Sequence, residues 1–76
     1  MIAFVEICTE LGKEKDVAEE LKKVEEVKEL FGAFGDLDII VKVEADDIDA
    51  IAKVVLEKIR TIDGVNETKT IITIPL

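Results

Sequence analysis

Histidine, serine, tyrosine, tryptophan and glutamine are absent from the sequence, and cysteine and proline occur once each. Without histidine or serine, the chain cannot build a Ser-His-Asp or Cys-His nucleophile. A single cysteine forms no internal disulfide and, without histidine, no ordinary structural zinc site. A chain of 76 residues buries only about 60% of the surface that it exposes when unfolded, and small domains usually need reinforcement. Oligomerisation is therefore the remaining way to stabilise this chain.

Long apolar runs and an excess of positive charge are missing too. No stretch approaches the roughly 18–20 apolar residues of a membrane span, and the segment from Met1 to Glu6 lacks the basic region of a secretory signal. Ten Lys and Arg residues against eighteen Asp and Glu leave a net charge of −8, whereas nucleic-acid affinity depends on Lys and Arg contacts to phosphate. We therefore expect a cytoplasmic protein that binds no membrane and makes no direct contact with nucleic acid. The preference for Glu and Lys, with one asparagine, follows the trend of thermophile proteins.

The spacing of apolar residues predicts two β-α-β units, one after the other. The predicted elements are strands at residues 2–9, 27–34, 39–45 and 65–74, and helices at residues 13–26 and 48–62. The second helix should bury the face that contains Ile48, Ile51, Ala52, Val55, Ile59 and Ile62. Gly64 is the expected C-cap of that helix.

The order β-α-β-β-α-β predicts an α+β fold of the ferredoxin-like class, as one domain over residues 1–76. Right-handed crossovers place both helices on one face of a four-stranded antiparallel sheet. The first strand is apolar on both faces: Ile2, Phe4 and Cys8 alternate with Ala3, Val5 and Ile7. A sheet with one free face should instead alternate apolar and polar residues. We therefore expect the open face to pack on a second copy, as a dimeric α+β barrel.

Two further features of the sequence, a lone cysteine and an acidic cluster, have structural interpretations. Cys8 lies in the middle of a strand, where a buried and inert thiol is expected. Asp46, Asp47 and Asp49 precede the second helix, where capping explains them better than a Ca²⁺ or Mg²⁺ site. We predict no metal site, no cofactor and no catalytic residue.

The segment Gly35-Asp36-Leu37-Asp38 between the second and third strands has two interpretations. It can be a hairpin turn in which glycine adopts a positive φ and aspartate bonds its own backbone. It can also be a ligand loop, in which free backbone N–H groups hold a carboxylate and the Asp38 side chain holds an ammonium group. A free amino acid carries both charges.

With these features, the sequence resembles the ligand-binding domain of the Lrp/AsnC family of transcriptional regulators, also called the RAM domain. The resemblance covers nearly the whole chain and is carried by the stretches 3–7, 27–43 and 59–72. Its most specific part is the Gly35 to Asp38 loop combined with Gly64-Val65, followed by Thr68 and Thr70. Relatives carry a helix-turn-helix before this domain, so the resemblance implies a stand-alone sensor.

The resemblance also implies how the domain assembles and what it binds. Facing sheets would form a homodimer, dimers would assemble into octamers or decamers, and a free amino acid would bind as the effector where dimers meet. Gly35 and Asp36 would offer backbone groups to the effector carboxylate, and Asp38 would face its ammonium group. The complete set of implied effector-binding residues is Phe34, Gly35, Asp36, Leu37, Asp38, Thr68 and Thr70. Phe34 replaces a threonine that is common in relatives.

We therefore predict a non-enzymatic, self-assembling amino-acid sensor that modulates full-length Lrp/AsnC regulators through mixed assembly. Three alternatives remain. One is a structural or assembly protein with a vestigial ligand pocket, which Phe34 filling the cavity would favour. A second is a small enzyme, since dimeric ferredoxin-like folds also host enzymes. The third is an amino-acid-binding domain of the ACT type, which fits the Gly35 to Asp38 hairpin less well.

Overall fold

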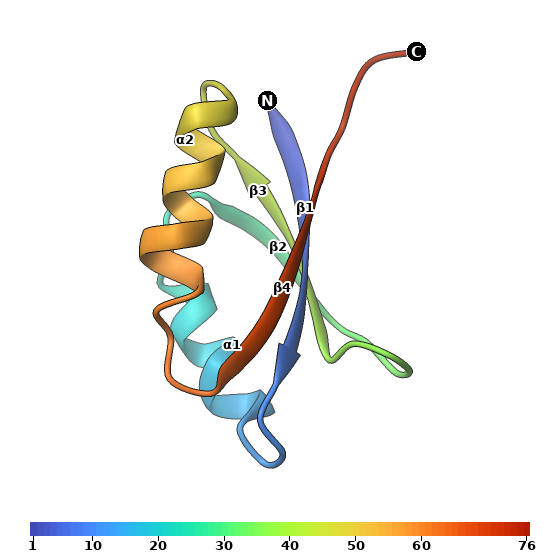
Figure 1. The fold of residues 1–76 in the computed structure, drawn as a ribbon, viewed down its shortest axis with the longest axis vertical. Coiled ribbons are helices and arrows are strands. Elements are labelled where there is room, and N and C mark those ends of the chain that lie inside the picture. The colour runs from blue at the N-terminus through green and yellow to red at the C-terminus, as the bar shows by residue number, and fades with distance from the viewer.

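A four-stranded antiparallel sheet covered by helices on one face organises the computed structural model, which describes residues 1–76 (Figure 1). The strands lie in the order β2-β3-β1-β4. The elements are β1 (Ile2–Thr9), α1 (Glu14–Lys22), β2 (Val27–Gly32), β3 (Ile39–Glu44), α2 (Ile48–Lys53), its π-helical continuation η1 (Val54–Ile59) and β4 (Val65–Ile72). The predicted ferredoxin-like α+β fold is therefore confirmed. No helix is long and apolar enough to span a membrane.

The core lies between the sheet and the helices. On β1, every second residue is buried, and Ala3, Val5 and Ile7 pair with buried residues of β3. The twelve core residues are Ala3, Val5, Ile7, Val17, Leu21, Ile39, Val41, Val43, Ile51, Val54, Val55 and Ile59. Each fully buried aliphatic side chain contributes about 1.5–3 kcal/mol relative to its exposed state. The hydrophobic effect therefore stabilises one face of the sheet and leaves the other uncovered.

Five elements end earlier than the sequence predicts; among them, β3 ends at Glu44 rather than Ala45, and the second helix ends at Ile59 rather than Ile62. Helix α1 ends at Lys22, since the N–H groups of Lys23 and Val24 bond to carbonyls three residues back, in a tightening turn. Strand β2 ends at Gly32, and one further bond in the same register, from the N–H of Ala33 to the carbonyl of Asp38 (2.8 Å), closes the loop. Strand β4 ends at Ile72 rather than Ile74.

The second helix differs from its predicted form in its second half. Residues 54–59 adopt a π-helix, in which Arg60 N–H donates to the carbonyl of Val55, five residues back (2.8 Å). An α-helix would place Lys58 beneath Val54 on the core face, whereas the i→i+5 spacing brings the apolar Ile59 there. The predicted apolar face is wrong in part: Val54 is buried, and Ile48 and Ala52, in the α-helical part before the π-helix, are exposed.

The N-terminus of α2 confirms the capping interpretation of the acidic cluster. The Asp47 side chain accepts a hydrogen bond from the backbone N–H of Ala50 (2.8 Å). This bond satisfies one of the backbone donors that a helix start leaves free. No group of three or more potential ligand side chains is positioned to hold a metal ion.

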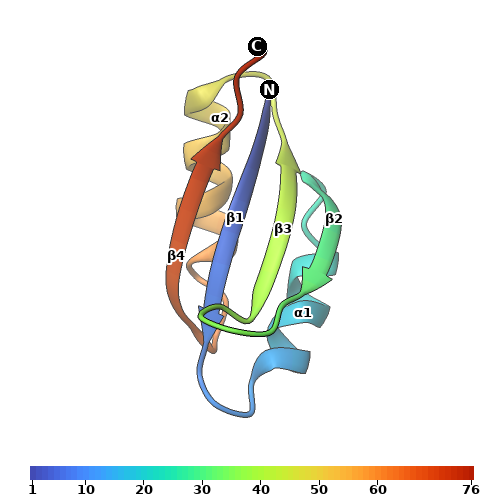
Figure 2. The same ribbon diagram turned by 90° about the vertical axis from the view of Figure 1, so that its right-hand side faces the viewer.

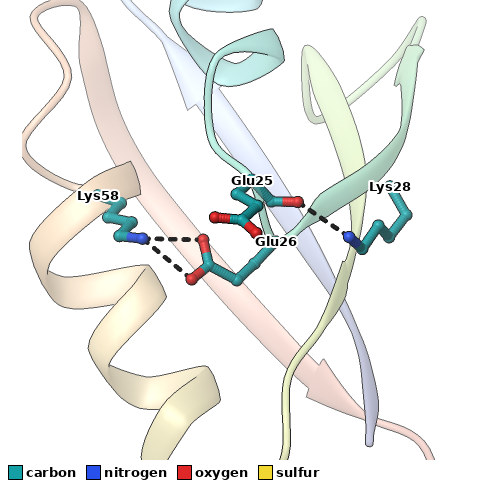
Figure 3. A network of polar contacts seen from close by, with 4 residues as sticks. All are labelled: Glu25, Glu26, Lys28 and Lys58. Atoms are coloured by element: carbon teal, nitrogen blue, oxygen red, sulfur yellow. Dashed lines mark hydrogen bonds and ion pairs between the residues drawn. The ribbon is translucent and has the colours of Figure 1, made fainter.

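The π-helix turns Lys58 away from the core, and Lys58 forms an ion pair with Glu26. Its Nζ lies 3.0 Å from each carboxylate oxygen of Glu26, which links η1 to the connection between α1 and β2 (Figure 3). Beside it, the Nζ of Lys28 donates to the backbone carbonyl of Glu25 (3.1 Å). The hydrogen bond from Lys58 lowers the pKa of Glu26 below its ordinary value of 4.5, and a backbone hydrogen bond adds to the effect.

Gly64 connects the second helix to β4 at a position where no other residue fits. Its φ is +99°, and an added Cβ would lie 2.9 Å from the Cβ of Lys13 and 3.0 Å from a methyl carbon of Val17. Its carbonyl accepts the N–H of Glu10 (2.7 Å). The predicted C-cap glycine is thus also the point where the helix-to-strand turn packs against α1.

We predict that Gly64→Ala destabilises the fold more than Gly12→Ala. Both glycines have a positive φ, which costs an L-residue about 1–2 kcal/mol, but nothing lies within 4 Å of an added Cβ at Gly12. At Gly64, the clash of the added Cβ with Lys13 and Val17 should increase the loss of stability by about a further 1–3 kcal/mol. Urea unfolding of the two variants measures the difference, and equal losses would contradict the packing role of Gly64.

We also predict that Glu26→Gln loses stability at neutral pH but not in acid. Because the pKa of Glu26 is lowered in the folded state, its contribution is present above the unfolded pKa and disappears as the pH falls through the folded value. Since Lys58 is half exposed, we expect only about 0.2–1 kcal/mol at pH 7. The free energy of unfolding of the variant and of the unchanged protein, measured at pH 7 and at a pH below the folded pKa of Glu26, gives this contribution.

The matched control for this pH dependence is Glu25→Gln. Glu25 is adjacent and exposed, and only its backbone carbonyl takes part in the contacts of Figure 3. If both variants lose the same stability at neutral pH, the contact between Glu26 and Lys58 contributes nothing.

Candidate functional site

The face of the sheet opposite the helices combines aromatic, aliphatic and charged side chains. Directly opposed residues of antiparallel strands share a face, so the register defines two rows across this open face. One row contains Glu29, Lys42, Phe4 and Ile71, and the other contains Phe31, Ile40, Glu6 and Lys69. Phe31 and Ile71 remain 51% and 45% exposed. The open face thus carries an apolar surface that this single chain leaves uncovered.

Charged residues on the open face are partly paired with one another. The Nζ of Lys42 lies 3.3 Å from the Glu29 carboxylate, and Glu6 lies opposite Lys69 in the register of β1 and β4. Paired charges can enter an interface at lower cost than single ones. The open face is therefore compatible with contact to a second protein surface.

The loop of residues 33–38 lies on the same side as the open face. Figure 2 shows this loop between β2 and β3 crossing in front of the sheet towards the end of β1, and Figure 1 shows it projecting away from the helices. Asp38 N–H donates to the carbonyl of Ile7 (3.0 Å), and the Cys8 thiol lies 3.5 Å from the carbonyl of Asp36. The loop is thus attached to the last residues of β1.

The Asp38 side chain makes the strongest of these attachments. Its Oδ2 accepts hydrogen bonds from the backbone N–H of Thr9 (2.8 Å) and from the Thr9 hydroxyl (3.3 Å). Its other oxygen, Oδ1, accepts no hydrogen bond from the chain. The carboxylate therefore orients the loop through one oxygen, and the other oxygen has no hydrogen-bond partner in the chain.

Between the loop and the edge of the sheet lies a hollow of about 290 Å³. It is lined by Glu6, Cys8, Asp36, Leu37, Glu67, Thr68 and Lys69. Three carboxylates and one ammonium group surround it, so the hollow can contact both ends of a zwitterion. A larger hollow of about 830 Å³ lies between α1 and the second helix, and it contains none of the predicted site residues.

The structure brings together some of the predicted site residues and separates others. Asp36, Leu37 and Thr68 line the hollow, whereas Asp38 does not and instead bonds to Thr9 at the end of β1. Phe34 is fully exposed and does not fill the hollow. Gly35, with a φ of +139°, forms the turn beside it. Thr70 lies elsewhere, in an apolar groove between α2 and β4.

Five residues of this region were absent from the sequence-based site. Glu6, Cys8, Glu67 and Lys69 line the hollow, and Thr9 holds Asp38. The alternation of β1 places Glu6 and Cys8 on the same face of the sheet, and this pattern could have indicated that they share a site. Cys8 is only partly buried there, contrary to the expected full burial. The contact between Thr9 and Asp38 joins residues 29 positions apart, and no local pattern reports it.

The comparisons with known proteins agree on the family. The family model described as the Lrp/AsnC ligand binding domain matches residues 2–75. Among curated proteins, the chain is 35% identical over 74 residues to the HTH-type transcriptional regulator FL11 of Pyrococcus abyssi, a match that spans 97% of this chain and 48% of that regulator. The chain spans less than half the length of this regulator and of the other curated relatives compared.

Solved structures share the fold over nearly the whole chain. The crystal structure of FFRP-DM1 is 40% identical, has a TM-score of 0.91, and matches over 96% of this chain and 97% of its own. The complex of the transcriptional regulator NMB0573 from Neisseria meningitidis with L-Met is 22% identical, with a TM-score of 0.88, over 97% of this chain and 49% of its own. By sequence and by fold, this chain belongs to the Lrp/AsnC family and forms its ligand-binding domain.

Proposed function

We propose that the chain is an amino-acid sensor that assembles through its open face and modulates full-length Lrp/AsnC regulators by mixed assembly. It acts by binding, without catalysis. The effector is a free amino acid, held by the loop of residues 33–38 above the hollow. Family membership supports a ligand-binding role, and the geometry of this loop supports the class of ligand.

One observation carries the proposal: free donors and a free acceptor lie on one short loop. The N–H groups of Gly35, Asp36 and Leu37 donate to no group of the chain, and Asp38 Oδ1 accepts from none. Backbone N–H groups beside a glycine bind carboxylates, and a carboxylate oxygen binds an ammonium group. An α-amino acid offers both groups two bonds apart.

Two further facts support an amino-acid effector over a vestigial pocket. The Neisseria regulator of the same fold was solved with L-Met, so we extend amino-acid binding to this chain. Phe34 points into solvent and leaves the hollow open, whereas the assembly-only alternative requires Phe34 to fill it. Thr68 and Leu37 then contact the effector side chain, while Thr70 lies outside this site.

Assembly and sensing are coupled in this proposal because loop and open face lie on the same side of the sheet. A homodimer of facing sheets places the loop of each copy beside its partner, and dimers extend to an octamer or decamer. A ligand that binds the assembled form better stabilises the assembly, and assembly raises ligand affinity by the same factor.

We predict that calorimetric titration with the twenty amino acids detects binding, and that Asp38→Asn weakens it at least about tenfold, or 1.4 kcal/mol. Asparagine keeps an oxygen for the N–H of Thr9 but loses the charge that attracts an ammonium group. The loop therefore stays in place while the ligand contact weakens.

Thr9→Val is the matched control for this titration. Valine removes the hydroxyl that donates to Asp38 at 3.3 Å but keeps the shorter backbone bond and the carboxylate charge. Binding should persist in Thr9→Val. The site is wrong if no amino acid releases heat, or if Asp38→Asn binds as the unchanged protein does.

We predict that Phe31→Asp reduces the mass of the assembly in light scattering. Phe31 lies half exposed in the open face, where a charge in the interface of facing sheets is costly. Leu11→Asp is the control, because Leu11 is 99% exposed and lies between β1 and α1, away from that face. If both variants keep the original mass, the sheets do not form the interface.

A further inference from the structure

An apolar groove lies along the free edge of the sheet, between the second helix and β4. It has a volume of about 260 Å³ and seven lining residues, none of them charged, in a chain of which 37% of residues are charged. Ile48 and Leu56 of the helix remain 57% and 56% exposed there, and Thr70 and Ile72 form the strand side. The groove is thus an uncharged surface on a highly charged molecule.

The strand beside this groove also has unused bonding capacity. Because the strand order is β2-β3-β1-β4, β4 pairs with β1 on one side only. One row of its backbone N–H and C=O groups therefore faces away from the sheet, and such edges accept an additional strand. An extended segment in the groove would add main-chain hydrogen bonds to apolar contacts.

The chain carries a segment that matches the groove in residues 73–76, which we call the tail. Ile74 and Leu76 are 73% and 117% exposed, and Figure 1 shows the tail leaving the body beyond β4. In an extended chain, residues two apart point to the same side, so both side chains can enter one groove. No side chain of the tail is charged.

The dimensions of tail and groove agree. From Ile48 to Lys53 the α-helix rises about 8 Å at 1.5 Å per residue, and Val55 and Leu56 extend the groove into the π-helical turn. The three tail residues beyond Thr73 span about 10 Å when extended. Two aliphatic side chains can therefore occupy the groove along its length.

The tail cannot turn back into the groove of its own chain. Thr73 is held to β1, since both its N–H (3.1 Å) and its hydroxyl (2.8 Å) donate to the carbonyl of Ile2. The tail therefore continues in the direction of β4, and the fixed φ of Pro75 restricts a reversal.

We propose that the tail of one copy docks in the groove between α2 and β4 of a second copy, as an added edge strand. The absence of charge in both surfaces favours this occupant, because two copies that each carry a charge of −8 repel one another elsewhere. This interface uses different residues from the open face. Copies can consequently join through two independent surfaces.

Disulfide cross-linking tests this contact directly. In a Cys8→Ala background, chains with Leu56→Cys are mixed with chains with Ile74→Cys, refolded together and oxidised. We expect a covalent heterodimer in at least about tenfold greater yield than from the control pair, Leu11→Cys with Ile74→Cys. Leu11 is 99% exposed and lies outside the groove.

Two outcomes would overturn the proposal. Equal yields from the Leu56 and Leu11 pairs would show that the tail does not dock in the groove. A higher yield from Phe31→Cys with Ile74→Cys would place the tail on the open face instead. Native mass spectrometry of Ile74→Asp provides the second measurement: we expect a smaller assembly than that of the unchanged protein, and an unchanged assembly contradicts the proposal.

Discussion

Packing of two helices against a single face of the sheet is the interaction on which the other features of this molecule depend. Alternate residues of β1 and β3 supply the strand side of that core, so the remaining alternate residues must lie on the uncovered face. The loop of residues 33–38 is bonded to the end of β1 on this same side. One side of the sheet therefore forms the core, and the opposite side carries the candidate site.

The fold was predictable because its signals are periodic and local. Alternation along β1 placed Phe4 and Ile7 on opposite faces, and the order of elements then left few topologies. The structure confirms both. Residues with local hydrogen-bonding roles were equally predictable from the sequence, as the capping residue Asp47 at the start of α2 demonstrates.

The candidate site was predictable only in part, because its contacts join distant positions. The loop of residues 33–38 was visible in the sequence, but the attachment of Asp38 to Thr9 depends on where β1 ends relative to that loop. Thr70 matched the family pattern, yet the register places it with Val5 on the helix side of the edge strand. Side-chain direction in an edge strand follows from pairing, and pairing is not a local property of the sequence.

The wide turn of η1 has a consequence for comparing this chain with its relatives. A π-helical turn holds one residue more than an α-helical turn of the same height. A relative with one residue fewer between Val54 and Ile59 could close this turn as ordinary α-helix and keep both apolar side chains in the core. Such a relative would align with a single-residue gap and would lack a counterpart of the lysine that reaches Glu26. A one-position gap in this helix is therefore a difference in local winding, with the core unchanged.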